Sequence, residues 1–298
     1  MVAMFDEHGP ELAAVKAVGH RTVHGGDQLT KTCLIDESVV ETLEQLSPLA
    51  PLHNPPGIAG IRGARRALPD VPHVAIFDTA FFATLPPEAY TYAINAEVAQ
   101  EYRVRRYGFH GTSHNFVAHQ AAEFLGRPYE EVTQIVCHLG NGASISAIRN
   151  GVAVDTSMGL TPLEGLVMGT RSGDLDPGIF DYLGTRGMSL SEINTQLNKH
   201  SGLLGLSGSS NDMRTLRELS AAGDADAALA IDVFCYRLAK YVAALCVPMN
   251  GMDALVFTGG IGENDALTRA QVCERLGFLG VTLDPQANRA GGSAARNV

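Results

Sequence analysis

Short apolar runs that stop at a glycine, an aspartate or a histidine recur along this chain and limit the folds it can adopt. They occupy residues 17–18, 74–77, 135–137 and 254–257, and segments with helical periodicity lie between them. Apolar runs bounded by turn residues are typical of buried strands. Their alternation with helices predicts an α/β fold.

Two helices can be recognised from their end signals and spacing. Ser189 and Glu192 form a capping-box pattern ahead of apolar residues, and Gly202 closes the segment. A second helix is expected at about 225–247, because apolar side chains recur there every three or four residues and the other faces are mostly alanine. Its apolar positions are Ile231, Phe234, Leu238, Val242 and Leu245.

The chain has 298 residues, more than most single domains contain, so we expect two domains. We place the first domain at residues 1–79 and the second at 80–298. The sequence shows no low-complexity tract and no internal repeat, which predicts short linkers.

The formal net charge is −10, and no long run of lysine and arginine compensates for it. A field of this sign repels nucleic-acid backbones and anionic membrane surfaces, so we expect neither as a partner. An anionic substrate would have to be captured by a few local cations and backbone amides, which draws attention to individual arginines.

The five cysteines are odd in number and widely spaced, without a CxxC pair, which argues against a disulfide framework or a structural zinc site. Residues 1–16 carry Asp6, Glu7 and Glu11 in place of a basic leader, and the sequence has no run of about 18 apolar residues. We therefore expect a soluble protein in a reducing compartment, the cytoplasm.

Residues 135–148 are typical of a β-hairpin, with Gly140, Asn141 and Gly142 at the turn. An Asn-Gly pair supplies the positive φ values that tight turns need. The small turn residues also leave backbone N–H groups uncovered, and His138 lies just before them. The turn is therefore either a plain hairpin or a phosphate cradle.

A second glycine-rich segment, 257–264, follows an apolar strand and precedes a helix-like segment at 265–276. Gly259, Gly260 and Gly262 would then lie near a helix N-terminus, where a nucleotide phosphate is attracted. The pattern matches neither a Walker loop nor a dinucleotide fingerprint. Close packing of the strand on the helix is the alternative role for these glycines.

Three polar clusters place cation-capable side chains beside glycines, at residues 19–26, 107–114 and 169–174. Arginine can bind carboxylate or phosphoryl oxygens with two N–H groups, and histidine can donate to a phosphoryl group. Asp78 follows a predicted strand and is either a magnesium partner or a turn cap. His53 suits a rigid turn equally well.

The histidines also raise the alternative of a zinc hydrolase that uses His20, His24, His110 and His114. Histidines spaced i, i+4 share a metal only on a helix. The glycines around both pairs are expected to break such helices, which argues against this alternative.

These motifs together resemble the acetate kinase family over nearly the whole chain. The matching segments are 19–21, 52–56, 77–81, 107–114, 138–142, 157–159, 161–165, 169–171, 210–214 and 258–264. The resemblance implies the two-domain fold of actin, sugar kinases and Hsp70, a duplicated RNase H-like fold, with ATP in the cleft. It also implies a homodimer formed through the second domain. The implied reaction is reversible transfer of the ATP γ-phosphoryl group to acetate, with ATP and ADP as nucleotides. The implied cofactor is Mg²⁺, or Mn²⁺ in its place.

The resemblance also assigns roles to residues. Asp78, His110 and Arg171 would be catalytic. Arg21 and Arg171 would grip the acyl carboxylate and the phosphoryl group, His110 would stabilise that group, and Asp78 would help activate the reaction or place magnesium. The substrate-binding set is Arg21, Val23, Leu52, Phe109 and Pro162. The nucleotide-binding set is His138, Asn141, Gly142, Asp212, Met213, Arg214, Gly259, Gly260, Ile261, Gly262 and Asn264.

The sequence departs from the family pattern in two places. The family's first strand with its Asn-x-Gly-Ser-Ser-Ser loop, and its Pro-x-x-Glu-Glu segment, whose glutamate is tied to magnesium, are not found here. We therefore expect an incomplete first domain and assign no metal ligand within this chain. Phe82 stands where many relatives carry histidine, and we give it no role. A propionate or butyrate kinase and a non-catalytic nucleotide-binding module are the alternatives.

Overall fold

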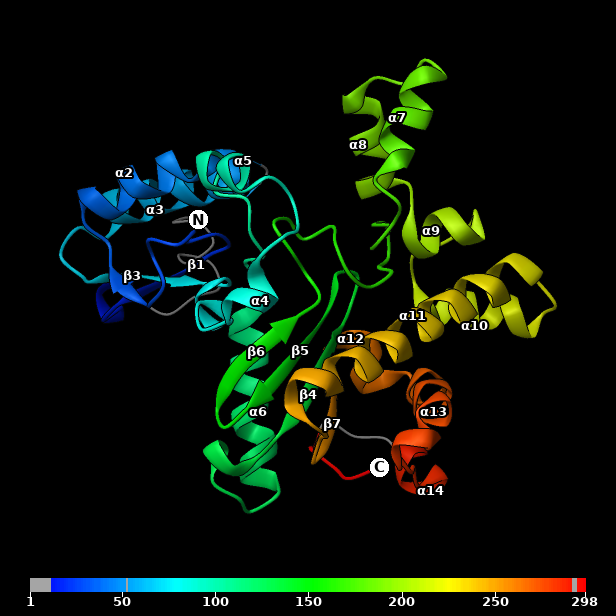
Figure 1. The fold of residues 1–298 in the computed structure, drawn as a ribbon. Coiled ribbons are helices and arrows are strands. Elements are labelled where there is room, and N and C mark those ends of the chain that lie inside the picture. Colours follow the sequence, from blue (N-terminus) through cyan, green and yellow to red (C-terminus); the bar gives the residue numbers. More distant parts are fainter. Residues whose placement is uncertain (1–11, 52, 291–293) are drawn as a thin grey trace. The chain divides into compact units, whose positions relative to one another are not determined.

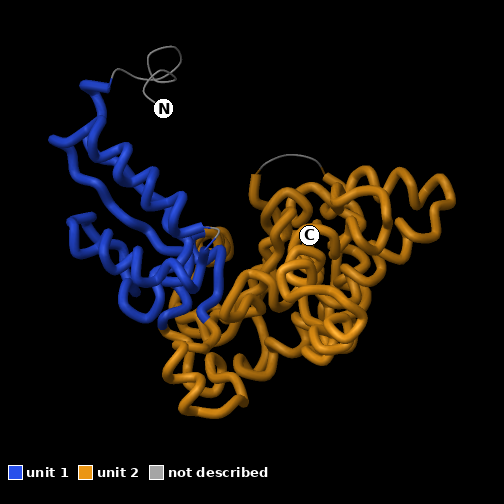
Figure 2. Tube along the Cα trace, turned by 90° about the horizontal axis from the view of Figure 1, so that it is seen from above, with its two compact units in different colours: residues 1–83, 107–112 blue, residues 84–106, 113–298 orange. Residues whose placement is uncertain are grey.

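The computed structural model describes residues 12–51, 53–290 and 294–298. The chain forms two compact units, which Figure 2 colours separately. The first unit comprises Met1–Ala83 and Tyr107–Thr112, and the second comprises Thr84–Arg106 and Ser113–Val298. The domain division at residues 79 and 80 stays a prediction.

The first unit is a three-stranded sheet with two helices packed on it (Figure 1). The strand order is β1-β3-β2, in which β1 runs parallel to β3 and β2 antiparallel to it. Ile58 and Ile61 of one helix and Val40 and Leu43 of the other are buried with Phe77 of the sheet. The elements are η1 (Leu12–Ala14), β1 (Val18–Thr22), β2 (Cys33–Leu34), α2 (Glu37–Gln45), η2 (Ser47–Leu49), α3 (Asn54–Ala67), β3 (His73–Phe77) and η3 (Ala80–Phe82).

The second unit is built on a four-stranded mixed sheet of order β6-β5-β4-β7. Its strands are β4 (Gln134–Leu139), β5 (Ala143–Arg149), β6 (Val152–Thr156) and β7 (Ala254–Thr258). Strand β4 pairs antiparallel with β5 and parallel with β7. All residues from Ala143 to Ile148 are buried, as in a strand that is covered on both faces. The α/β class and all four strands expected from apolar runs are thus confirmed.

Some helices pack on this second sheet, and others, among them α7 (Gly178–Thr185) and α8 (Leu190–Lys199), lie away from it (Figure 1). The long α11, with the apolar spacing noted above, packs on β5 and β6 and contacts α9, α10 and α13. The helices are α4 (Pro87–Tyr90), α5 (Ala96–Glu101), α6 (Gly111–Phe124), η4 (Tyr129–Glu131), α7 (Gly178–Thr185), α8 (Leu190–Lys199), α9 (Gly202–Ser207), α10 (Met213–Ala221), α11 (Ala225–Met249), α12 (Gly259–Asn264), α13 (Ala266–Arg275), η5 (Gly277–Leu279) and α14 (Pro285–Arg289).

The two predicted helices are confirmed with small shifts at their ends. Both hydrogen bonds of the capping box between Ser189 and Glu192 are present at the start of α8. The helix ends at Lys199, and Gly202 instead begins α9 with φ of +62°. None of the helices in the described ranges is long and apolar enough to cross a membrane.

The expected hairpin at 135–148 is present, but the reason given for its turn is wrong. Neither Asn141 nor Gly142 has a positive φ. The turn is instead closed by a hydrogen bond of 3.0 Å from the Gly140 N–H to the Gly142 carbonyl. The Asn-Gly pair with positive φ values is Asn150 (+54°) and Gly151 (+74°), between β5 and β6.

Candidate active site

In the first unit, Arg21 and Asp78 form an ion pair at the carboxyl ends of the parallel strands β1 and β3. The Arg21 Nε donates to Asp78 Oδ1 at 3.0 Å, and Nη2 donates to Oδ2 at 2.6 Å. The Asp78 side chain is 1% exposed and the Arg21 side chain 62% exposed. The hydrogen bond to Asp78 raises the pKa of Arg21. A buried carboxylate therefore fixes an exposed cation at the sheet edge where α/β proteins bind ligands.

Residues 107–112 pack against the same aspartate. The Gly111 N–H donates to the Asp78 carbonyl at 3.0 Å, and a Cβ on Gly111 would lie 2.1 Å from that oxygen. The Thr112 hydroxyl lies 3.4 Å from Asp78 Oδ1. His110, just before this contact, has φ of +59°, a left-handed conformation that costs a residue with a side chain about 1–2 kcal/mol. The packing of Gly111 on Asp78 therefore accompanies a strained backbone at His110.

His24 anchors this segment from the other side. Its ring is buried, accepts a hydrogen bond at Nδ1 from the Gly26 N–H (3.0 Å), and meets the rings of Tyr107 and Phe109 edge to face. Burial lowers the pKa of His24 to about 4, so the ring is neutral. Asn54 donates to the His24 carbonyl at 3.1 Å. His24, Asn54 and Tyr107 were not predicted as site residues, although all three lie in motif segments.

Only two of the residues predicted to line the acyl pocket, Val23 and Phe109, lie in the described part of the first unit. Phe109 is 2% exposed and packs on His24, and Val23 is half-buried. Leu52 lies outside the described residues, and Pro162 belongs to the second unit. Their role as an acyl pocket stays a prediction.

The histidines of the zinc alternative are held by separate partners. His20 Nε2 lies 2.9 Å from His73 Nδ1, and the two nitrogens of buried His114 each lie 2.7 Å from the hydroxyls of Ser144 and Ser146. His114 does lie on a helix, because α6 begins at Gly111 instead of being broken there. Within residues 12–51, 53–290 and 294–298, no three histidine, cysteine or acidic side chains are grouped to hold a metal ion.

Asp78, the predicted magnesium partner, is already bound by an arginine. Both oxygens of Asp78 accept hydrogen bonds from Arg21 within a buried environment. Mg²⁺ requires near-octahedral oxygen ligands and keeps several waters, which a side chain buried in this way does not accommodate. Both Asp78 oxygens are thus taken up by Arg21, and a role of Asp78 in placing magnesium stays a prediction.

In the second unit, Arg171 lies within an irregular segment that follows β6. Its Nη1 donates to the Pro162 carbonyl at 2.6 Å, and burial lowers its pKa. In the described part of the chain, no carboxylate is paired with Arg171. Its backbone packs tightly, because a Cβ on Gly202 would lie 2.7 Å from the Arg171 carbonyl oxygen. Arg171 is thus a cation fixed by a backbone carbonyl, and an anionic ligand could neutralise its charge.

Two of the predicted nucleotide-binding segments and the Arg171 segment meet at Asn141. The Gly169 N–H donates to the Asn141 carbonyl (2.9 Å), and the Asn211 side chain donates to Asn141 Oδ1 (2.8 Å). This joins the turn at 140–142 to the Arg171 segment and to the start of α10. His138, on β4, has its Nδ1 2.8 Å from the Ser113 hydroxyl.

At the start of α10, the predicted nucleotide-binding residues Asp212, Met213 and Arg214 take part in capping and packing this helix. Asp212 is the N-cap, and its 2.8 Å ion pair with Arg214 contributes to a pKa of about 2. Met213 is buried. A nucleotide contact by these three residues stays a prediction.

The glycine segment 258–264 begins at the carboxyl end of β7, which runs parallel to β4. Gly259 has φ of +78°, and a Cβ there would lie 2.6 Å from the Leu139 carbonyl oxygen, so this glycine serves close packing. Gly260 is exposed, and its Cβ would meet no protein atom within 4 Å. Around them, Gly262 is buried, Ile261 is half-buried, and the Asn264 side chain donates to the Gly260 carbonyl at 2.9 Å.

Comparison with known proteins identifies the family. The Acetokinase family profile matches residues 1–298. Acetate kinase from Chromobacterium violaceum is 56% identical over 94% of this chain and 70% of its own length. Acetate kinase from Thermotoga maritima is 54% identical over 93% of this chain and 70% of its own length. The chain thus spans about 70% of these relatives.

Solved structures of acetate and propionate kinases have the same fold as this chain. The crystal structure of Porphyromonas gingivalis acetate kinase matches with a TM-score of 0.92 at 45% identity, covering 97% of this chain and 73% of that one. A propionate kinase from Francisella tularensis matches with a TM-score of 0.91 at 48% identity, covering 96% and 74%. The expected actin, sugar kinase and Hsp70 type of fold is confirmed by these matches. The chain belongs to the acetokinase family of phosphotransferases.

Proposed function

We propose that this protein transfers the γ-phosphoryl group of ATP reversibly to acetate, giving acetyl phosphate and ADP. Membership of the acetokinase family and the similarity to acetate kinases support this activity. The observation that carries it is the exposed guanidinium of Arg21, fixed on buried Asp78 beside the strained backbone of His110.

The proposed chemistry needs little from the protein except placement and charge. A carboxylate is already a nucleophile, and phosphoryl transfer depends on in-line positioning and on neutralising the equatorial oxygens. Arg21 binds the acyl carboxylate, Arg171 binds the phosphoryl group, and His110 donates to that group as charge develops. The contacts of Asp78 support a role in orienting Arg21.

The nucleotide is proposed to bind along the second sheet's edge, where the turn at 140–142, the start of α10 and the segment 258–264 lie. Mg²⁺, or Mn²⁺ in its place, would enter with the nucleotide, since divalent ions of this kind are commonly held by phosphates and water with few protein ligands. We also propose a homodimer and a cytoplasmic location.

The activity can be tested by incubating the protein with ATP, Mg²⁺ and acetate and trapping acetyl phosphate with hydroxylamine. The reverse assay starts from ADP and acetyl phosphate and measures ATP. Formation of both products is expected. If neither product forms while ATP still binds, the chain is a non-catalytic nucleotide-binding protein.

Propionate is the second candidate substrate, because one of the similar structures is a propionate kinase. An extra methylene in an apolar pocket changes discrimination by about 1–3 kcal/mol, or roughly 10- to 200-fold. We expect kcat/KM to be highest for acetate among acetate, propionate and butyrate. A higher value for either of the longer acids would reassign the substrate.

A further inference from the structure

The segment 157–174 contains no helix or strand, yet residues 165–169 within it are buried. It carries both Pro162 and Arg171. Long irregular segments inside a compact domain are uncommon and usually functional. Its conformation must be enforced by specific contacts, because it has no regular backbone hydrogen bonding.

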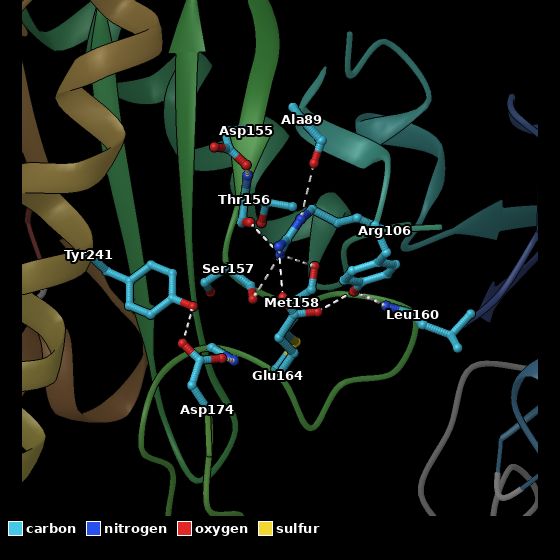
Figure 3. Close-up of polar contacts among 12 residues, drawn as sticks. Ala89, Arg106, Asp155, Thr156, Ser157, Met158, Leu160, Glu164, Asp174 and Tyr241 are labelled. Carbon is cyan, nitrogen blue, oxygen red and sulfur yellow. Dashed lines mark hydrogen bonds and ion pairs between the residues drawn. The ribbon is translucent and has the colours of Figure 1, made fainter. Parts of the chain in front are cut away.

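Arg106 supplies the first of these contacts (Figure 3). Its Nη1 donates to the carbonyls of Thr156 at 2.9 Å and Ser157 at 3.1 Å. Its Nη2 donates to Glu164 Oε1 at 2.7 Å. The side chains are 16% and 29% exposed for Arg106 and Glu164. One guanidinium thus fixes the beginning of the segment and a point seven residues beyond Ser157.

Tyr92 completes this arrangement at the second oxygen of Glu164. The Tyr92 hydroxyl donates to Glu164 Oε2 and accepts a hydrogen bond from the Leu160 N–H at 2.9 Å. A Cβ on Gly159 would lie 1.6 Å from Glu164 Oε2 and 2.0 Å from the Tyr92 hydroxyl. The chain between Ser157 and Glu164 therefore closes around the carboxylate, with room only for glycine at position 159.

Asp174 holds the far end of the segment. Its Oδ1 accepts the Gly165 N–H at 2.7 Å, and its Oδ2 accepts the Tyr241 hydroxyl at 2.5 Å (Figure 3). Gly165 has φ of +104°. The two ends of the stretch 165–174 are therefore joined to each other and to α11.

The Pro162 carbonyl lies within the part of the segment that Arg106, Glu164 and Tyr92 close. This carbonyl accepts the Arg171 Nη1 at 2.6 Å. The orientation of the Arg171 guanidinium therefore depends on where the turn at 158–164 places this oxygen. A guanidinium binds an anion bidentately only when its planar fork is aimed correctly.

We propose that Arg106, acting with Glu164 and Tyr92, is a positioning residue that sets the orientation of Arg171 through the Pro162 carbonyl. This inference rests on the proposed function of Arg171. Packing alone would be an unusual reason for this arrangement, since apolar residues of similar volume often serve a buried site as well as an ion pair does. The donors of Arg106 instead go to the successive carbonyls of Thr156 and Ser157, where β6 leads into the segment that carries Arg171.

The first test is Arg106→Lys in the protein, which keeps the charge and removes the planar fork. We expect kcat for acetyl phosphate formation to fall by about 10- to 100-fold, because small misplacements of catalytic groups cost this much. The Kd for ADP should stay unchanged. Arg127→Lys is the matched control: Arg127 also binds a carboxylate, Asp253 at 3.2 Å, and a backbone carbonyl, that of Glu131, and both partners lie outside the segment. Its kcat should be normal.

A double-mutant cycle separates positioning from general destabilisation. If Arg106 acts through Arg171, Arg106→Lys should change kcat by less than about twofold once Arg171 is already lysine, since coupled residues are not additive. The same fold loss in both backgrounds, or a normal kcat in a folded Arg106→Lys protein, would overturn the proposal. A normal kcat for Arg171→Lys and Arg171→Ala would instead reject the proposed role of Arg171 itself.

If Arg106→Lys does not fold, Tyr92→Phe tests the same turn with a smaller change. It removes the hydroxyl that contacts Glu164 and Leu160 and keeps the ring. The expected result is a lower kcat that is restored neither by more acetate nor by more ATP. A Tyr92→Phe protein with a lower melting temperature and an unchanged kcat would show that the turn serves only stability.

Discussion

The glycines that follow β7 allow packing and nucleotide binding to be tested separately at adjacent positions. At Gly259, with φ of +78°, a Cβ would meet the Leu139 main chain at 2.6 Å. The left-handed conformation costs alanine about 1–2 kcal/mol, and crowding in a packed interior costs about 1–3 kcal/mol more. We therefore expect Gly259→Ala to lower the free energy of unfolding by roughly 2–5 kcal/mol.

Gly260→Val should behave in the opposite way. No protein atom lies within 4 Å of the added Cβ, and valine is no worse than glycine in a helix. The melting temperature should therefore change little. If this edge holds the nucleotide phosphates, the isopropyl group should weaken ADP binding by tenfold or more, which is about 1.4 kcal/mol.

The assay for this pair is a calorimetric ADP titration beside a melting curve for each variant. A loss of 1 kcal/mol lowers the melting temperature of a domain of 150–250 residues by about 2–4 °C, so Gly259→Ala should melt roughly 4–20 °C lower. Wild-type ADP affinity in Gly260→Val would refute the nucleotide assignment. An unchanged melting temperature in Gly259→Ala would refute the packing role.

Three further predictions concern charged and titratable groups. Arg171→Ala should lower kcat by about 10²–10³-fold with little change in melting temperature. Arg21→Ala should lower both kcat and the melting temperature, because it leaves the buried Asp78 carboxylate unpaired. Steady-state kinetics and melting curves of the two variants check this. His110→Ala and His110→Gly should both slow turnover. The glycine variant should be about 1 kcal/mol more stable in urea unfolding, because the φ of +59° suits glycine. Equal stabilities of the two variants would contradict the argument that the backbone at His110 is strained. The pKa of His24 is lowered to about 4, so the folded state binds fewer protons there than the unfolded state, and stability present above pH 6.5 is lost as pH falls toward 4. This loss should reach about 2 kcal/mol at pH 5, and His24→Asn should show a smaller difference in urea unfolding between pH 7 and pH 5.

The hairpin at 135–148 shows how a local signal can give the right element for the wrong reason. The apolar run at 135–137 and the Asn141-Gly142 pair predicted the hairpin correctly, but the backbone at this pair has no positive φ. Asn141 instead uses its carbonyl and side chain to bind Gly169 and Asn211. The tight Asn-Gly turn occurs at Asn150, where the same rule applied to the sequence would have found it.

The sequence motifs marked candidate site residues one at a time, but they did not show which of these residues contact one another. The motifs marked Arg21 and Asp78 separately, and 57 positions separate them in the chain. Only the parallel pairing of β1 with β3 brings the ends of these strands together. Arg106 carried no signal at all, because the Thr156 and Ser157 carbonyls that it binds lie 50 or more positions away, and backbone acceptors have no residue identity for a motif to display.

Arg21 and Arg171 differ in whether a carboxylate already balances their charge, and from this difference we infer which substrate group each binds. Arg21 already faces one carboxylate, so the pair is neutral before any ligand binds, whereas Arg171 faces a neutral carbonyl and its pKa is lowered by burial. A partly buried cation without a counter-charge gains most from a ligand with high negative charge, since the desolvation cost has already been met. Arg171 is therefore better suited to the phosphoryl group, which carries more charge, and Arg21 to the singly charged carboxylate. In an enzyme with ten excess negative charges, this unbalanced cation provides a local attraction that the protein's overall field opposes.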